Sequence, residues 1–369
     1  MKQENQELQG QLAIFHGAGK ELELASQVVP SLKSGELLIR NLYTTLCGSD
    51  LHTFCGLRQE TCPTVLGHEI VGEILAIDSA HLGYDLKGKK IAVGDTITWS
   101  IFSSNPLSPN SIAGIPQKGD SLFKYGHALV KEGDAFHGGL AEYCILKSHT
   151  EILKIPEEMP LPIAATLNCS VSTVAGALRL AGDLKDKTVL ITGMGHLGIT
   201  CAAMCREAGA DWIGAVDIAT ERLEEALHFG ADQLFHMNGN ATRLAEELKA
   251  LLPRNGVDVV FDMSGSPEAM ELGVEVLAIG GSAVWVGAVF NTRPLQLNAE
   301  KIIRSLITIK GLHNYNYDDF RNAFDFMKRN WQRYPFDKVV EKEFTLRQAE
   351  QAFEYAVKNK PFRVGIRFY

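Results

Sequence analysis

Two cysteines and one histidine, far apart in the sequence, have side chains suited to one metal ion. Cys47 precedes a polar Gly-Ser-Asp segment, His68 lies between Gly67 and Glu69, and Cys169 follows an asparagine. Each residue alone is more often a packing residue than a ligand. Two thiolates and an imidazole together are the ligands of a catalytic zinc that keeps its fourth position open. The set therefore predicts one zinc ion held by Cys47, His68 and Cys169.

A glycine pattern predicts a second kind of site, for a dinucleotide. Gly193, Gly195 and Gly198 form a G-x-G-x-x-G motif that also contains His196 and Leu197. The motif follows an apolar strand-like run and opens a helical pattern, which is the context that dinucleotide binding requires. In such a loop the backbone approaches the pyrophosphate, and the helix N-terminus offers unpaired N–H groups to it.

An acidic residue after the next predicted strand indicates which dinucleotide is bound. Asp217 follows Gly198 by nineteen residues, the position from which a carboxylate accepts hydrogen bonds from the adenosine ribose. A carboxylate there repels a 2′-phosphate, so the sequence favours NAD over NADP. Arg222 leaves NADP open, because a nearby arginine can accept that phosphate. Another ligand on a similar fold is the alternative reading of the glycine loop.

Composition excludes several classes of protein. The chain has 369 residues and a formal net charge of −8, which argues against a nucleic-acid or anionic-membrane partner. The nearly uncharged stretch 276–290 is too short to span a bilayer, so we expect no membrane helix. The polar N-terminus does not resemble a signal peptide, and seven cysteines read as reduced thiols or ligands. We expect a cytoplasmic protein.

The pattern of apolar runs changes along the chain and predicts two domains. Up to about residue 155, short apolar runs such as 36–40, 70–74 and 90–95 lie between turn residues and predict mainly antiparallel strands. From residue 187, strand and helix patterns alternate, which predicts a parallel sheet covered on both faces. Predicted strands are 188–191, 212–216, 233–235, 257–261, 283–286 and 306–309; predicted helices are 197–208, 220–229, 241–252 and 267–278. Helical patterns at 317–331 and 346–357 form a tail that we expect to return to the first domain.

These motifs, in this order over nearly the whole chain, resemble the medium-chain, zinc-dependent alcohol dehydrogenase family. The resemblance implies an α/β protein, with a GroES-like mainly-β catalytic domain at 1–170 and 313–369 and a doubly wound Rossmann NAD-binding domain at 171–312. It implies hydride transfer between NAD(H) and an alcohol, and a homodimer or homotetramer. It also implies roles for single residues: Asp50 and Glu69 as carboxylates that orient the metal ligands, Ser49 and His52 as a proton relay, and Thr173, Val286 and Arg363 as coenzyme contacts, Arg363 at the pyrophosphate.

The substrate is less constrained than the reaction. The segments 47–54, 98–100 and 122–127 are similar to a subgroup linked with phosphonate breakdown, and related cyclitol dehydrogenases share some of them. These similarities imply a small polar, hydroxylated or anionic substrate, with Lys124 or His127 as an anion contact. Phe54, Trp99 and Ile101 could line the pocket, although core packing is the commoner role for such side chains.

The sequence departs from the family at a second zinc site. Many members hold a structural zinc with four cysteines spaced C-x₂-C-x₂-C-x₇-C. That spacing falls here on Asn105, Ser108, Ser111 and Gly119, and there is no cysteine between Cys62 and Cys144. Amide and hydroxyl groups replace thiolates poorly on zinc. We therefore predict one zinc per chain, with the 105–119 lobe held by packing alone.

The other cysteines and histidines carry no argument from spacing and are interpreted as packing residues. They are Cys144, Cys201, Cys205, His16, His127, His137 and His313; a site of Cys47 with Cys55 and Cys62 is disfavoured by irregular spacing. Two other functions stay open: a zinc-free quinone or enone reductase of the same superfamily, and a non-catalytic nucleotide-sensing protein.

Overall fold

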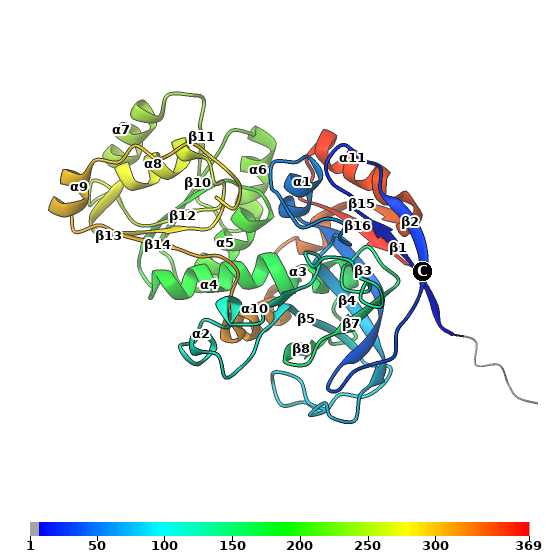
Figure 1. Cartoon of the computed structure of the whole chain (residues 1–369). Helices are drawn as coiled ribbons and strands as arrows, with labels where there is room; N and C mark the ends of the chain where they lie inside the picture. Colours follow the sequence, from blue (N-terminus) through cyan, green and yellow to red (C-terminus); the bar gives the residue numbers. More distant parts are fainter. Residues whose placement is uncertain (1–6, 369) are drawn as a thin grey trace, which may run out of the picture. The chain divides into compact units, whose positions relative to one another are not determined.

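A computed structural model describes residues 7–368 of the chain, which divide into two compact units (Figure 1). The first contains residues up to Cys169 together with 316–324 and 336 onward, and the second contains 170–315 and 325–335. The sequence placed the boundaries at 170/171 and 312/313. The tail differs from its prediction, because residues 325–335 belong to the second unit and only the segments on either side return to the first.

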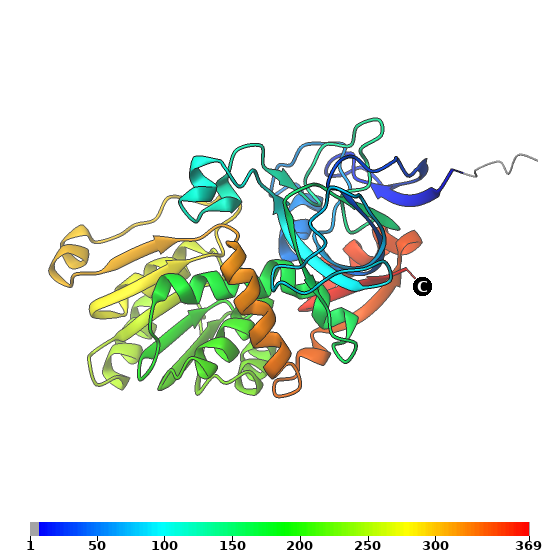
Figure 2. The same cartoon turned by 90° about the horizontal axis from the view of Figure 1, so that it is seen from below.

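The first unit is built mainly from antiparallel strands. Its large sheet has the order β15-β16-β3-β4-β5-β6, with β7 on β3 and β8 on β5, and β1 pairs with β2 separately. All of these pairs are antiparallel except β15 with β16. In Figure 2 the blue and cyan strands bend round the core of this unit. The strands are β1 Gln9–Ile14, β2 Glu23–Val28, β3 Leu37–Leu46, β4 Glu69–Ile77, β5 Thr96–Ser103, β6 Phe123–Lys124, β7 Tyr143–Leu146, β8 Thr150–Lys154, β15 Val340–Thr345 and β16 Arg363–Arg367.

Short helices complete the first unit. They are α1 Gly48–Phe54, α2 Pro109–Ile112, α3 Leu161–Thr166 and α11 Ala349–Asn359, with single 3₁₀ turns at Pro116–Lys118, Phe336–Lys338 and Leu346–Gln348. The strand predicted at 90–95 is wrong. Ile91 is buried, but residues 92–95 form a turn in which Asp95 accepts from the Ala92 N–H, and Gly94 takes a φ of +91°. A short apolar run in the sequence can therefore mark a turn with one buried side chain instead of a strand.

The second unit has a six-stranded, all-parallel sheet with the order β11-β10-β9-β12-β13-β14. The strands are β9 Thr188–Thr192, β10 Trp212–Asp217, β11 Gln233–His236, β12 Val257–Asp262, β13 Leu277–Trp285 and β14 Thr308–Gly311. The helices are α4 Ser172–Ala181, α5 His196–Glu207, α6 Thr220–His228, α7 Ala241–Leu251, α8 Pro267–Glu275 and α9 Ala299–Arg304. Helix α10, Tyr317–Asn330, continues from the first unit into the second. Figure 1 shows α7 and α8 on one side of this sheet and α4 and α5 on the other. Strand order and cover are those of a doubly wound dinucleotide-binding fold.

One helical run, Leu161–Ala181, is long and apolar enough to cross a membrane by length and composition alone. The prediction of no membrane helix rested on 276–290 and did not weigh this run. Its most apolar window is 72% buried within the fold, as expected of a core helix. A single π-helical turn, Leu167–Val171, interrupts it between α3 and α4.

Candidate active site

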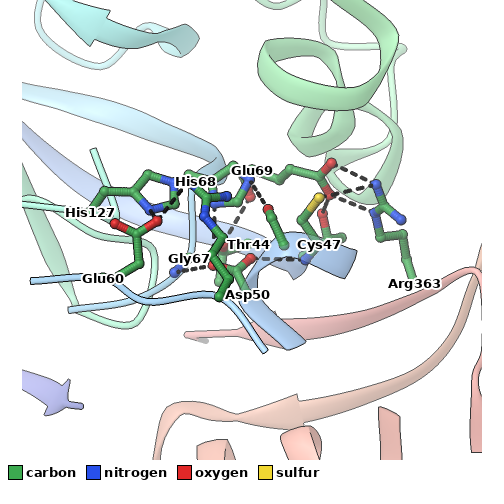
Figure 3. Close-up of polar contacts among 12 residues, drawn as sticks. Thr44, Cys47, Asp50, Glu60, Gly67, His68, Glu69, His127 and Arg363 are labelled. Atoms are coloured by element: carbon green, nitrogen blue, oxygen red, sulfur yellow. Dashed lines mark hydrogen bonds and ion pairs between the residues drawn. The ribbon is translucent and has the colours of Figure 1, made fainter. Parts of the chain in front are cut away.

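The three predicted metal ligands meet in the first unit. One ligand atom each from Cys47, His68 and Cys169 lie within 4.8 Å of one another, and Figure 3 shows Cys47 and His68 among their polar neighbours. Within the described residues 7–368, this is the only group of three or more histidine, cysteine or acidic side chains whose ligand atoms lie so close together. The structure therefore brings together the three residues predicted to share one site, although the first and third ligands are 122 positions apart in the sequence.

Local backbone structure places each ligand. Cys47 is the extended N-cap of α1, and its own N–H donates to Asp50 Oδ2 at 2.9 Å. His68 immediately precedes β4, so the sheet fixes it from one side. Cys169 lies in the π turn, and such turns are frequent at functional sites, because one extra residue in the turn re-aims the side chains.

The two thiols already behave as a coupled pair. A hydrogen bond from Cys169 holds the pKa of the Cys47 thiol well below its ordinary value, and sharing that proton raises the pKa of Cys169. Arg363 and His68 also favour the Cys47 thiolate. The Cys169 thiol therefore favours keeping its proton and donating it in a hydrogen bond to the Cys47 sulfur. A divalent ion would displace this proton, because a coordinating thiol is deprotonated outright.

Asp50 connects two of the ligands. Its carboxylate accepts hydrogen bonds from the N–H groups of Cys47 and of Gly67, at 2.9 and 3.2 Å, and lies 3.2 Å from Nδ1 of His68. The side chain is fully buried. Burial opposes a charged imidazolium, but Asp50 and the Cys47 thiolate outweigh burial and raise the pKa of His68. Asp50 occupies Nδ1 and leaves Nε2 for a metal, which is the usual way in which a carboxylate orients a histidine ligand.

Glu69 is held by an arginine at the other side of the site. Nε and Nη2 of Arg363 donate to the two Glu69 oxygens at 2.7 and 2.8 Å (Figure 3). The Thr45 hydroxyl donates to Oε2 of Glu69 at 2.6 Å. Nη2 also lies 3.7 Å from Cys47 Sγ. Burial raises the pKa of Glu69 and Arg363 opposes that rise, while Glu69 raises the pKa of Arg363 above its ordinary value. The sequence assigned Arg363 to the pyrophosphate; the structure places its guanidinium on Glu69, and the coenzyme contact stays a prediction.

The predicted relay residues lie on α1, beside the ligands. Ser49 Oγ is 3.3 Å from His68 Nε2, so the hydroxyl points to the ligand side of that ring. His52 follows three residues later, which places both side chains on the same face of the helix. Burial lowers the pKa of His52, which keeps its imidazole neutral and able to take up a proton.

The donor set fits a zinc ion. Two sulfurs and one nitrogen would supply three of the four tetrahedral positions, and the Asp50 carboxylate lies 3.2 Å from the other ring nitrogen of His68. The side chains in the first unit therefore match an open, catalytic type of zinc site rather than a closed structural one.

The glycine loop of the second unit is built as the sequence predicts. Gly193 has a φ of +88°, and a Cβ there would lie 2.7–2.8 Å from Ser264. A Cβ on Gly198 would lie 2.0 Å from the Gly193 carbonyl oxygen, so only glycine allows this strand-to-helix turn. Gly195 differs, because a Cβ there has open space out to Arg222 Nη1 at 3.9 Å. That opening lies at the N-terminus of α5, where phosphate groups bind.

Asp217 ends β10 beside this loop. Its Oδ2 accepts from the Met194 N–H at 2.5 Å, and its Oδ1 accepts from the Ala219 N–H at 2.9 Å. The carboxylate therefore braces the glycine loop as well as occupying the position predicted for ribose binding. Arg222, on α6, brings Nη1 to 3.9 Å from where a Cβ on Gly195 would lie, so its side chain reaches the glycine loop.

The other predicted coenzyme residues are placed as follows. His196 and Leu197 open α5, Thr173 is the second residue of α4 and is buried, and Val286 directly follows β13 and is buried. All of these belong to the second unit, whereas Arg363 belongs to the first.

Sequence reasoning missed a polar group next to the metal ligands. Glu60 Oε1 is 2.6 Å from Arg58 Nη2 and 3.2 Å from His127 Nδ1, and the His127 ring centroid is 4.9 Å from that of His68 (Figure 3). His127 had been interpreted as a packing residue, apart from one possible anion contact. Glu60 and His127 are 67 residues apart and share no motif, so no sequence signal could have joined them.

The three apolar residues suggested for the pocket lie in the core. Trp99 is fully buried with its ring edge against Tyr125, Ile101 is buried, and Phe54 stacks on Phe353 at 4.5 Å. Core packing accounts for all three.

The cysteine-free lobe contains a hydroxyl cluster. Ser111 Oγ is 3.1 Å from Ser104 Oγ and 2.9 Å from Ser108 Oγ, and a Cβ on Gly119 would lie 2.0–2.9 Å from all three oxygens. Ser108, Ser111 and Gly119 are three of the four positions on which the cysteine spacing falls, and Ser104, the neighbour of Asn105, completes the cluster. Packing alone does not hold the lobe, because these hydroxyls bond to one another and the Asn110 side-chain amide donates to the Lys118 carbonyl near its far end.

Comparison with known proteins identifies the family. A model of the alcohol dehydrogenase GroES-like domain matches residues 33–157, and one of zinc-binding dehydrogenases matches 196–329. The L-threonine 3-dehydrogenase of Streptomyces coelicolor is 31% identical over 297 residues, covering 79% of this chain and 80% of that protein. The chain belongs to the zinc-dependent medium-chain alcohol dehydrogenases. This dehydrogenase is an oxidoreductase, as its relatives are.

Other relatives agree with this assignment. The L-threonine 3-dehydrogenase of Aeromonas salmonicida is 29% identical over 329 residues, covering 81% of the dehydrogenase and 90% of that protein. The crystal structure of an alcohol dehydrogenase from Thermotoga maritima superposes with a TM-score of 0.91 at 22% identity, covering 98% of this chain and 100% of that one. Benzyl alcohol dehydrogenase from Acinetobacter calcoaceticus gives 0.85 at 23%, covering 98% and 100%. These likenesses confirm the predicted GroES-like and Rossmann fold classes.

Proposed function

We propose that this dehydrogenase uses one zinc ion per chain and NAD to interconvert a small polar alcohol or polyol and its carbonyl form. The observation that carries the proposal is the convergence of Cys47, His68 and Cys169, with a serine hydroxyl at 3.3 Å from the histidine. A cyclitol or a phosphonate alcohol is the substrate class that the sequence favours. L-Threonine joins it, because relatives of 29–31% identity are named for that substrate.

The chain's own residues account for binding and proton movement. When bound, zinc would supply a Lewis acid that lowers the pKa of a hydroxyl at its open position. Ser49 Oγ lies beside Nε2 of His68 and is placed to accept the substrate's hydroxyl proton. His52, one helical turn further, is the next acceptor, and its lowered pKa keeps it unprotonated near neutral pH. Asp50, Glu69 and Arg363 hold the ligands in position.

The coenzyme assignment rests on the second unit. The opening above Gly195 and the N-terminus of α5 suit a pyrophosphate, and Asp217 suits the ribose of NAD. Arg222 at the same place is the residue through which NADP could be accepted. A solved relative from Sinorhizobium meliloti, 21% identical with a TM-score of 0.84 and covering 98% of this chain and 99% of that one, is described as bound to NADP.

A cysteine variant tests the function. We expect Cys169→Ala to hold less than about a tenth of the wild-type zinc and to lose turnover of polyols, cyclitols and hydroxyalkylphosphonates, while it still binds NAD. Cys55→Ser is the matched control, because Cys55 is exposed and outside the ligand set. Turnover that survives in Cys169→Ala would favour the zinc-free reductase. A wild-type protein that binds NAD but oxidises none of the panel would favour the nucleotide-sensing role.

A second variant tests the coenzyme. Asp217→Gly should weaken NAD binding and raise the ratio of NADP to NAD affinity, because the carboxylate that repels the 2′-phosphate is gone. The same change removes the acceptor for the Met194 N–H, so both affinities can fall through a looser loop. The ratio separates the two effects: an unchanged ratio would mean that Asp217 only braces the loop, and the NAD assignment would fail.

Cytoplasmic location and assembly as a homodimer or homotetramer stay predictions. Gel filtration with light scattering measures the second directly.

A further inference from the structure

We propose that Asp262 is a positioning residue for the nicotinamide half of the coenzyme. Its carboxylate holds the turn that follows β12, and its backbone holds the turn that follows β13. The nicotinamide nucleotide would bind against these two turns. The inference rests on the proposed function, since it concerns the coenzyme of the same reaction. It adds that two carboxylates act on different halves of the coenzyme site, Asp217 on the adenosine side and Asp262 on the nicotinamide side.

Asp262 lies at the switch point of the parallel sheet. From β9 the chain adds β10 and β11 on one side, and it then returns to add β12, β13 and β14 on the other. Ligands of doubly wound sheets bind outside the carboxyl ends of the strands at such a point. Thr192 and Asp262 are the last residues of β9 and β12, and they lie opposite each other in the parallel pairing. Asp262 is therefore at the edge of the sheet where a dinucleotide would cross from one half of the fold to the other.

Four hydrogen-bond donors converge on the Asp262 carboxylate. Oδ1 accepts from the Thr192 hydroxyl at 2.9 Å, and from the N–H and the hydroxyl of Ser264 at 3.2 and 2.6 Å. Oδ2 accepts from the Gly265 N–H at 3.0 Å. The side chain is fully buried, and all four donors are neutral dipoles. The carboxylate thus ties the end of β9 to the turn at 263–266.

Backbone contacts extend this arrangement to the next strand. The Asp262 carbonyl accepts from the N–H groups of Val286 and Gly287 at 3.0 and 3.2 Å. Gly265 packs so closely on Gly287 that a Cβ on Gly265 would lie 2.5 Å from the Gly287 carbonyl carbon. Close-packed backbone leaves little room for one turn to move alone. A shift of the turn at 263–266 would therefore be passed on to Gly287.

The two nucleotides of NAD belong on different sides of this edge. Asp217, the residue proposed for the adenosine ribose, ends β10 on one side of β9, whereas the turn at 263–266 follows β12 on the other side. Doubly wound folds consist of two halves that each bind one mononucleotide. The turn also borders the glycine loop, because a Cβ on Gly193 would lie 2.7 Å from the Ser264 nitrogen. A pyrophosphate at the glycine loop would therefore leave the nicotinamide nucleotide against the turns that Asp262 holds.

The test compares two ligands that differ in the nicotinamide nucleotide. NADH carries it, whereas ADP keeps only the adenosine and the two phosphates. Asp262→Asn fits the same space, but its amide nitrogen would face a donor such as the Gly265 N–H, so the turn must move. By isothermal titration of the zinc-loaded protein, the dissociation constant of NADH should rise roughly 10-fold and that of ADP should stay within about twofold, the order expected when one buried donor loses its acceptor.

Asp258→Asn is the matched control. Asp258 is also on β12 and also bonds β9, through the N–H and the hydroxyl of Thr188, each at 2.9 Å, but at the opposite end of the two strands. Asp258→Asn should lower Tm and leave the ratio of NADH to ADP affinity unchanged. Ser264→Ala removes one hydroxyl donor and keeps the backbone N–H. It should shift the ratio in the same direction as Asp262→Asn by a smaller factor, and it serves as the test if Asp262→Asn does not fold.

The ratio separates positioning from a general effect on the fold. An equal loss of NADH and ADP affinity, or an unchanged ratio in both Asp262→Asn and Ser264→Ala, would overturn the proposal and leave the dehydrogenase function standing. A wild-type protein that binds ADP as tightly as NADH would also overturn it, because the nicotinamide nucleotide would then contribute nothing to binding. A shifted ratio in the variants of a wild-type protein that oxidises no alcohol would uphold the role of Asp262 and overturn the proposed function.

Discussion

Replacing Arg363 by methionine is the sharpest test of how the metal site is held. The guanidinium makes two hydrogen bonds to Glu69, and the side chains of this pair are only 7% and 0% exposed. Arg363→Met keeps the aliphatic bulk but leaves a buried carboxylate without its cation. Breaking a buried pair in this way costs about 3–5 kcal/mol. In a domain of roughly 200 residues that corresponds to a Tm lower by about 6–20 °C.

The assay is differential scanning calorimetry of the zinc-loaded protein, with two matched variants. Arg321→Met removes an exposed ion pair with Asp318, 40% and 69% exposed, and should cost at most about 1 kcal/mol. The double variant Arg363→Met with Glu69→Leu removes both buried charges and should recover most of the loss. NAD affinity is measured on the same samples. If Arg363→Met lowers Tm no more than Arg321→Met, while NAD binding weakens strongly, the buried-pair reasoning is refuted and Arg363 acts on the coenzyme.

Two further predictions follow from the loop and the lobe. Gly195→Ala should leave Tm nearly unchanged, because its Cβ meets open space, and should weaken NAD binding at least tenfold, because the proposed pyrophosphate site lies there. Gly198→Ala should lower Tm through its clash with backbone; equal effects of both on Tm would contradict this. Replacing Ser108 and Ser111 by alanine should destabilise the lobe by about 1–2 kcal/mol and leave zinc at one per chain, and total-metal analysis that returns two would refute the assignment.

The parallel-sheet unit could be predicted in detail because local pattern decides it. Predicted and observed helices begin within a residue of each other from α5 to α8, and β9 to β12 end within one residue of expectation. The last two strands are less accurate. β13 begins at Leu277 rather than 283, and Leu306 has a positive φ before β14 starts at Thr308. The short helix α9 went unpredicted, since its six residues bury none of their side chains and carry little apolar periodicity.

The metal ligands could be found from residue type, but their surroundings could not. Cys47 and His68 stand in recognisable motifs, whereas the Arg363–Glu69 pair joins residues 294 apart through the pairing of β16 with β3 and of β3 with β4. A pattern along the chain carries no information on such pairings. The same holds for Glu60 and His127, which meet only because two loops fold over the ligand set. The residue types thus indicated the chemistry of the site. Pairings between strands far apart in the sequence determined which side chains hold the metal ligands.

Because serine hydroxyls hold the lobe, its structure depends on neither a bound metal nor reduced thiols. Hydroxyl groups neither require an incoming metal to reach their final arrangement nor react with peroxide as thiolates do. Ser104, Ser108 and Ser111 connect through hydrogen bonds between their own hydroxyl groups. Chelators or oxidants should therefore abolish turnover at the ligand set and leave the lobe folded, so that loss of catalysis and loss of structure become separate events in this chain.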